Sequence, residues 1–340
     1  MSATSQLTDL SDLVADLSVK LRGQTGVTAT SNIMKRAINT ALHDMHLGMD
    51  YKFPWAERSA RILTRAQYST GTVTATQGST ALTGTSTVWT TTDAFGIANA
   101  RANGKIKIAG GLTPYTVSSV GGAGTITLSS EFTEATATDT TYIYYEDEYA
   151  LASDFLRPVD AQVFSDEASI EIIGRTEFRR LYPTNSTPGR VAVASIIDFA
   201  PSGNTTPIRR VRFAPPPSTA MTIPYTYITG NLAVSSAGVA AANMSADSDE
   251  PIIPLRYRHA LVFHALYHLY RDRKDDSRSQ EAKAEYTDIM NRMQADTEVG
   301  ANRPRFAPRT GPYASRARRP WRGGGGRYDL NGRFDRLEDR

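Results

Sequence analysis

The sequence contains no cysteine. Disulfide bonds, thiolate nucleophiles and cysteine-ligated zinc sites are therefore excluded. No apolar run approaches the ~18 residues that a membrane helix requires. The N-terminus also lacks a basic segment followed by an apolar one, so we expect no secretory signal. These absences predict a soluble protein that is made in the cytoplasm.

Positive charge is scarce outside the C-terminal stretch. The 340 residues carry a net charge of only +3. From Arg303 onward, however, 11 arginines accompany four acidic residues, a net charge of +7, and the remainder carries −4. The basic character therefore belongs to residues 303–340 and not to the body of the protein.

Motifs that carry catalysis are absent as well. The sequence has neither a phosphate-binding Gly-x-x-x-x-Gly-Lys-Ser/Thr loop nor a Gly-x-Ser-x-Gly nucleophile elbow. The acidic pairs Asp147/Glu148 and Asp275/Asp276 lie at junctions between expected elements, where solvated turn residues are the ordinary interpretation. We predict neither an enzyme nor a bound cofactor.

The histidines leave one alternative open. His264 and His268 have the i, i+4 spacing of a zinc-binding helix, but Ala265 stands where such helices carry glutamate. His43 and His46 could in principle complete a site from another helix. Packed or interfacial histidines are the favoured interpretation, so no metal site is predicted.

Apolar residues at helical spacing predict four main helices, over residues 7–22, 31–45, 255–274 and 277–298. Pro251 and Pro254 mark the start of the third helix. Ser277 with Gln280 forms a capping box for the fourth. We expect the four helices to close an antiparallel bundle. Its core and subunit-packing positions are predicted to be Leu255, Val262, Leu266, Leu269, Tyr286, Ile289 and Met293.

The composition changes at Tyr68 to threonine and glycine with little charge. A hairpin at 70–84 and strands at 105–109, 115–120, 125–129 and 141–145 predict a small barrel or sandwich around Trp89. Further strands are expected at 168–173, 191–197, 208–214 and 222–227, with a short helix at 177–181. Residues 230–250 have the composition of a linker.

The predicted fold class is thus α+β. An antiparallel four-helix bundle carries an inserted small β-barrel or sandwich and an extended C-terminal arm. The expected boundaries are 1–67 for the N-terminal helices and 68–146 for the β insertion. Residues 147–300 form the rest of the body, and 301–340 form the arm.

The arm combines arginines with regularly spaced aromatic residues, and it cannot bury a core of its own. Three interpretations remain: contact with DNA phosphates, docking on an acidic protein partner, or a flexible terminus. The candidate binding residues are Arg303, Arg305, Phe306, Arg309, Tyr313, Arg316, Arg318, Arg319, Trp321, Arg322, Tyr328 and Phe334.

Three stretches resemble the head-to-tail adaptor, or connector, proteins of tailed bacteriophages. They are the N-terminal helices ending in YKFPW at 51–55, the insertion that closes with EYALASDF at 148–155, and PIIP at 251–254 leading to RDRKDD at 271–276. The resemblance spans most of residues 7–298.

This resemblance implies a structural virion protein at the head–tail interface, assembled in the bacterial cytoplasm. About twelve copies would form a ring under the portal protein and line the DNA exit channel. The arm would dock on the portal. Neighbouring adaptor subunits, tail tube, nozzle or fibre proteins, and the genomic DNA are the other expected partners, and no membrane is expected. The alternatives are a DNA-binding protein that uses the basic arm, or a β-rich tail or baseplate component.

Overall fold

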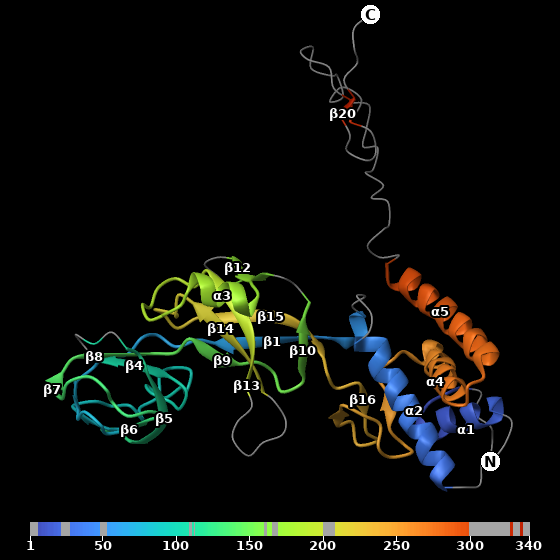
Figure 1. Cartoon of the computed structure of the whole chain (residues 1–340), viewed down its shortest axis with the longest axis horizontal. Coiled ribbons are helices and arrows are strands. Elements are labelled where there is room, and N and C mark those ends of the chain that lie inside the picture. The colour runs from blue at the N-terminus through green and yellow to red at the C-terminus, as the bar shows by residue number, and fades with distance from the viewer. Residues whose placement is uncertain are drawn as a thin grey trace, which may run out of the picture. The chain divides into compact units, whose positions relative to one another are not determined.

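The computed structural model of the chain forms two compact units, residues 1–290 and 291–340, which are described separately. The described residues are 6–21, 28–47, 53–108, 111, 113–159, 162–164, 169–199, 208–298, 327–328 and 334–335. Within them, the first unit contains packed helices and four β-sheets (Figure 1).

Three helices of the first unit pack against one another: α1 (Leu10–Lys20), α2 (Thr28–Leu47) and α4 (His259–Asp272) (Figure 1). Asp9 caps α1 by accepting a hydrogen bond from the Asp12 backbone N–H at 3.0 Å. Side chains three or four positions apart form the buried stripes, which contain Leu10, Leu13, Leu17, Ile38, Ala41, Leu42, Met45, Leu261, Val262, Ala265 and Leu266.

The predicted antiparallel four-helix bundle is wrong. The fourth helix forms as α5 (Asp276–Glu298) and contacts α4 through the stacked rings of Tyr286 and His264, but among the described helices the close backbone packing is between α1, α2 and α4. Between residues 276 and 290 its buried side chains are Ser279, Ala282, Tyr286, Ile289 and Met290. A single narrow stripe can cover one neighbour but cannot close a bundle. Sheets, not helices, hold most of the remaining core.

Seven strands between residues 72 and 145 form one sheet. In the order β7-β2-β3-β6-β5-β4-β8, the strands are Ala137–Thr140, Thr72–Ala75, Ala81–Thr85, Thr125–Leu128, Tyr115–Gly122, Lys105–Ile108 and Tyr142–Tyr145. Only Thr141 separates the two edge strands β7 and β8, so the sheet has to curl to bring its two edges near each other. No ladder joins β7 to β8 among the described strands, so the sheet is a half-barrel and neither a closed barrel nor a two-sheet sandwich. Trp89 is fully buried in its core.

A five-stranded sheet follows in the order β11-β12-β13-β14-β9. Its strands are Gln162–Phe164, Ser169–Ile172, Val193–Phe199, Ile208–Ala214 and Glu148–Ala150. Helix α3 (Arg175–Leu181) lies in the connection between β12 and β13, which pair in parallel.

A three-stranded sheet shares its core with this one, in the order β1 (Glu57–Leu63), β15 (Thr222–Thr229), β10 (Phe155–Pro158). Two short 3-10 turns, η1 (Pro54–Ala56) and η2 (Leu255–Tyr257), precede β1 and α4.

Residues 230–250 are structured and do not form a simple linker. Strands β16 (Ala233–Val234), β17 (Ala240–Ala241) and β18 (Glu250–Pro251) form a small sheet. Asn39 of α2 holds this segment by exchanging hydrogen bonds with the Met244 backbone at 2.9 and 3.0 Å. Among the described helices, none is both long and apolar enough to span a bilayer.

Candidate functional site

Most of the predicted binding arm lies outside the described residues. This applies to Arg303, Arg305, Phe306, Arg309, Tyr313, Arg316, Arg318, Arg319, Trp321 and Arg322. Tyr328 and Phe334 are register partners in an antiparallel pair, β19 (Arg327–Tyr328) with β20 (Phe334–Asp335). Portal binding by the arm stays a prediction.

The predicted helix positions fall into two environments. Val262, Leu266 and Leu269 on α4, and Tyr286, Ile289 and Met293 on α5, are buried. Leu255 instead lies in η2, before α4 begins, and its side chain is 37% exposed. Subunit packing through these residues stays a prediction.

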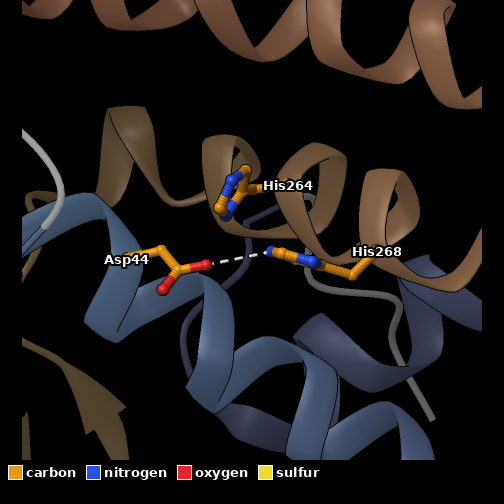
Figure 2. Close-up of side chains that lie close together, drawn as sticks. All are labelled: Asp44, His264 and His268. Atoms are coloured by element: carbon orange, nitrogen blue, oxygen red, sulfur yellow. Dashed lines mark hydrogen bonds and ion pairs between the residues drawn. The ribbon is translucent and has the colours of Figure 1, made fainter. Parts of the chain in front are cut away.

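A cluster of three potential ligands joins α2 to α4. His264 and His268 of α4 face Asp44 of α2, and one ligand atom from each residue lies within 4.8 Å of the others (Figure 2). His268 Nε2 is 3.1 Å from the Asp44 carboxylate. Figure 2 shows the two imidazole rings converging on this carboxylate from one helix. We call these three residues the Asp–His cluster.

Aromatic rings hold the cluster in place. The His264 ring stacks on Tyr286 of α5 at a centroid distance of 4.3 Å and meets the His268 ring edge-on at 4.6 Å. Burial, assisted by the nearby His268 ring, lowers the pKa of His264 to about 4. Burial also raises the pKa of Tyr286 to about 12, with the Asp44 carboxylate acting in the same direction. His264 is therefore neutral at pH 7.

The two histidines of α2, His43 and His46, point away from the Asp–His cluster. His43 Nε2 lies 2.6 Å from the Asn243 side-chain oxygen, and His46 Nδ1 lies 2.8 Å from the Leu42 carbonyl oxygen. Asp44 faces the α4 pair in their place. Periodicity could not single out this residue, since a carboxylate on a polar helix face is usually solvated.

A second polar cluster lies where the half-barrel joins the five-stranded sheet. Asp147 has no exposed side-chain surface, and its Oδ2 atom accepts hydrogen bonds from Lys105 Nζ at 2.6 Å and Arg212 Nε at 2.8 Å. Asn185 Nδ2 donates to the same oxygen at 3.2 Å. The expectation that Asp147 is a solvated turn residue is wrong, because cations from both sheets surround it.

The chain passes between the body and the half-barrel at two crossings, one near Asp147 and one between β1 and β2, and the second is also held by a buried charged side chain. Arg65 is buried between β1 and β2, and its guanidinium reaches Asp93 at 3.2 Å and the Ile97 carbonyl at 2.7 Å. Both crossings into the half-barrel therefore carry buried charge-assisted hydrogen bonds. These contacts fix the insertion to its neighbours; they do not form a catalytic arrangement.

Comparison with known families identifies the chain. The model of the SU10 adaptor protein family matches residues 98–309, which is more than half of the sequence. No curated protein matches the chain. The match confirms the expected resemblance at the level of a phage adaptor, in a family of structural proteins and not of enzymes. The chain therefore belongs to the SU10 adaptor protein family and is a structural adaptor protein of a bacteriophage virion.

Proposed function

We propose that this adaptor joins the DNA-filled head to the tail as a ring of about twelve subunits beneath the portal. The family match carries the proposal, since it runs from within the half-barrel, through both C-terminal helices, into the start of the arm. In this proposal the ring lines the DNA exit channel, and tail tube, nozzle or fibre proteins bind on the far side.

A ring subunit has to transmit force between two partners without coming apart. The buried contacts of Asp147 and Arg65 support this role, because they lock the inserted half-barrel to the body at both crossings. Breaking such buried pairs is strongly unfavourable. A rigid insertion suits a surface that must meet a tail protein in one orientation.

Contacts between neighbouring subunits need apolar surface that the isolated chain leaves accessible. Leu255 lines an open depression of about 660 Å³ together with Leu7, Pro254 and His259. A second depression, of about 590 Å³, lies between α1, α4 and α5 and contains Phe263 and Tyr270. Both combine apolar and charged side chains, as protein interfaces do.

The arm is the part that we assign to the portal. Arginine and aromatic residues are enriched at interface hot spots, where planar groups pack and the guanidinium forms paired hydrogen bonds. The arm has 11 arginines from Arg303 onward, interspersed with Phe306, Tyr313, Trp321, Tyr328 and Phe334. An acidic, concave surface on the portal is the expected docking partner.

The charge of the body suits a DNA channel. Residues 1–302 carry a net charge of −4, and like charges repel, so DNA would slide past without sticking. A strongly basic channel surface in an assembled ring would contradict this part of the proposal.

Co-sedimentation with purified portal rings tests the proposal. The full chain is compared with a chain that ends at Asn302, and with a matched variant in which the five arm aromatics become serine while all arginines remain. We expect the full chain to bind, the truncated chain to lose binding, and the serine variant to bind weakly at high salt. Equal binding by all three would contradict docking through the arm, and binding by none would contradict the adaptor ring.

DNA binding is the second candidate, favoured by the arm's net charge of +7. A protein that contacts about 6–10 DNA phosphates displaces their counterions, so its affinity for DNA falls by about 10³–10⁵ when the salt concentration rises from about 50 to about 200 mM. Retention on DNA with this salt dependence, combined with no portal binding, would favour the second candidate over the first.

A further inference from the structure

We propose that the Asp–His cluster of Asp44, His264 and His268 is a binding site for a divalent transition-metal ion of the zinc type. The ion would connect α2 to α4, two helices more than 200 residues apart in the sequence. Asp44 lies outside residues 98–309, so the family match does not imply this site. The site is also independent of the proposed ring.

The geometry is close to that of a bound site. Zinc lies about 2.0–2.2 Å from nitrogen and carboxylate ligands, so tetrahedral ligands are about 3.3 Å apart. His268 Nε2 and the Asp44 carboxylate are already 3.1 Å apart, and the third ligand atom lies within 4.8 Å of both. A shift of about 1.5 Å, within reach of rotation of the partly exposed Asp44 side chain and small movements of the two rings, completes the arrangement.

His264 has a nitrogen to spare. Its Nδ1 atom is buried and has no hydrogen-bond partner among the described residues. A buried polar atom without a partner is unfavourable, and such groups are uncommon in folded proteins.

The donor set selects the class of metal. Two imidazoles favour zinc, nickel, cobalt or copper, whereas magnesium and calcium prefer oxygen ligands. The ligand set has three protein groups and leaves a fourth position for water. The side chains of His268 and Asp44 are 26% and 47% exposed, so an ion can enter from solvent.

Stacking pre-organises the site. Tyr286 lies against the His264 ring at 4.3 Å, and Tyr267 meets the His268 ring at 5.2 Å. These contacts limit the rotation of both rings before any ion arrives. A pre-ordered ligand set loses less conformational entropy on binding, which raises affinity.

Cobalt binding tests the proposal directly. The full chain, without a histidine tag and stripped with a chelator, is titrated with Co²⁺ while its visible absorption is recorded, and then with Zn²⁺ in competition. We expect one ion per chain, an intense tetrahedral spectrum that Zn²⁺ abolishes, and no effect of Mg²⁺. A thermal midpoint that rises with Zn²⁺ concentration would follow from binding to the folded state alone.

Matched variants separate the cluster from adventitious binding. His268→Ala and the isosteric Asp44→Asn should each weaken cobalt binding by more than the 10–100-fold that loss of a supporting partner typically causes. His43→Gln, on the same helix as Asp44 but hydrogen-bonded to Asn243, should leave binding unchanged. Circular dichroism verifies that each variant is folded.

Three outcomes would overturn the proposal. The first is no cobalt spectrum from the full, folded chain. The second is an equal loss of binding in His43→Gln and His268→Ala. The third is full binding by folded Asp44→Asn and His268→Ala, which would leave the cluster as an ordinary hydrogen-bonded contact between His268 and Asp44.

Discussion

Lys105 of the half-barrel donates a 2.6 Å hydrogen bond to the fully buried carboxylate of Asp147, at the start of the five-stranded sheet. Arg212 of β14 donates to the same oxygen at 2.8 Å. Two cations from different sheets therefore share one anion. The carboxylate thus holds the two sheets together through charge-assisted hydrogen bonds.

Asp147→Asn should destabilise the protein by about 3–5 kcal/mol, because it leaves Lys105 and Arg212 without their buried counter-charge. The free energy of unfolding, measured in urea, checks this. Glu148→Gln is the matched control: Glu148 is partly exposed and 3.8 Å from Arg212, so its loss should cost less than about 1 kcal/mol. Similar losses in both variants would show that burial of the pair is not the cause.

Tyr142→Phe tests the core of the half-barrel. Trp89 Nε1 donates to the Tyr142 hydroxyl at 2.9 Å, and that hydroxyl donates to the Thr70 carbonyl at 2.8 Å. Removing the hydroxyl leaves a buried indole N–H without an acceptor, which should cost about 1–3 kcal/mol. Unfolding followed by tryptophan fluorescence measures it. Ile143→Val, at a 39% exposed neighbouring position, should change stability by less than about 0.5 kcal/mol.

The elements with strong local patterns could be predicted from the sequence. Leu10, Leu13 and Leu17 repeat at helical spacing and lie on the buried face of α1. Trp89, predicted as the core anchor of the β insertion, is fully buried. Periodicity works here because burial of one face is what creates the pattern.

Long-range partners could not be predicted in this way. Asp147 and Asp44 look like ordinary solvated acids, and only the fold brings Lys105 to one and His268 to the other. The prediction that four helices pack into one bundle was wrong for a related reason. A stripe such as Ala282 and Tyr286 shows that α5 buries a face, but not how many neighbours cover it.

Arg258 should be sensitive even to a conservative change. Its guanidinium donates to the Ile253 carbonyl at 3.0 Å, to Glu250 at 3.0 Å, and to the Thr8 carbonyl. It thereby ties the residue before the Asp9 cap to the start of α4. Arg258→Lys keeps the charge but cannot reproduce the planar fork. We expect a loss of about 2–3 kcal/mol in thermal or urea unfolding.

Arg256→Lys is the control for this prediction. Arg256 is exposed and lies over the Tyr257 ring at 4.7 Å. The substitution keeps the charge above the ring, so stability should change by less than about 0.5 kcal/mol. A loss at Arg256 as large as that at Arg258 would contradict the role of the fork.

His46 should make stability depend on pH. Burial lowers its pKa from 6.5 to about 4, and the nearby His43 and Arg157 add to this shift, while the hydrogen bond to the Leu42 carbonyl opposes it. Between these values the unfolded chain binds a proton that the folded chain does not. Stability contributed by the neutral ring is therefore complete above pH 6.5 and declines as the pH falls toward 4, by at most about 1.4 kcal/mol per pH unit.

His46→Gln isolates this effect, because glutamine does not titrate. The free energy of unfolding is measured from pH 7 to pH 4 for both chains, and the difference between the two curves is taken. We expect the wild-type curve to fall more steeply below pH 6.5 and the curves to run parallel above it. His43→Gln should leave most of the slope in place, since His43 is in hydrogen-bond contact with Asn243 near the surface. A His46→Gln curve parallel to the wild type throughout would mean that this imidazole takes up its proton as readily in the folded chain as in the unfolded one.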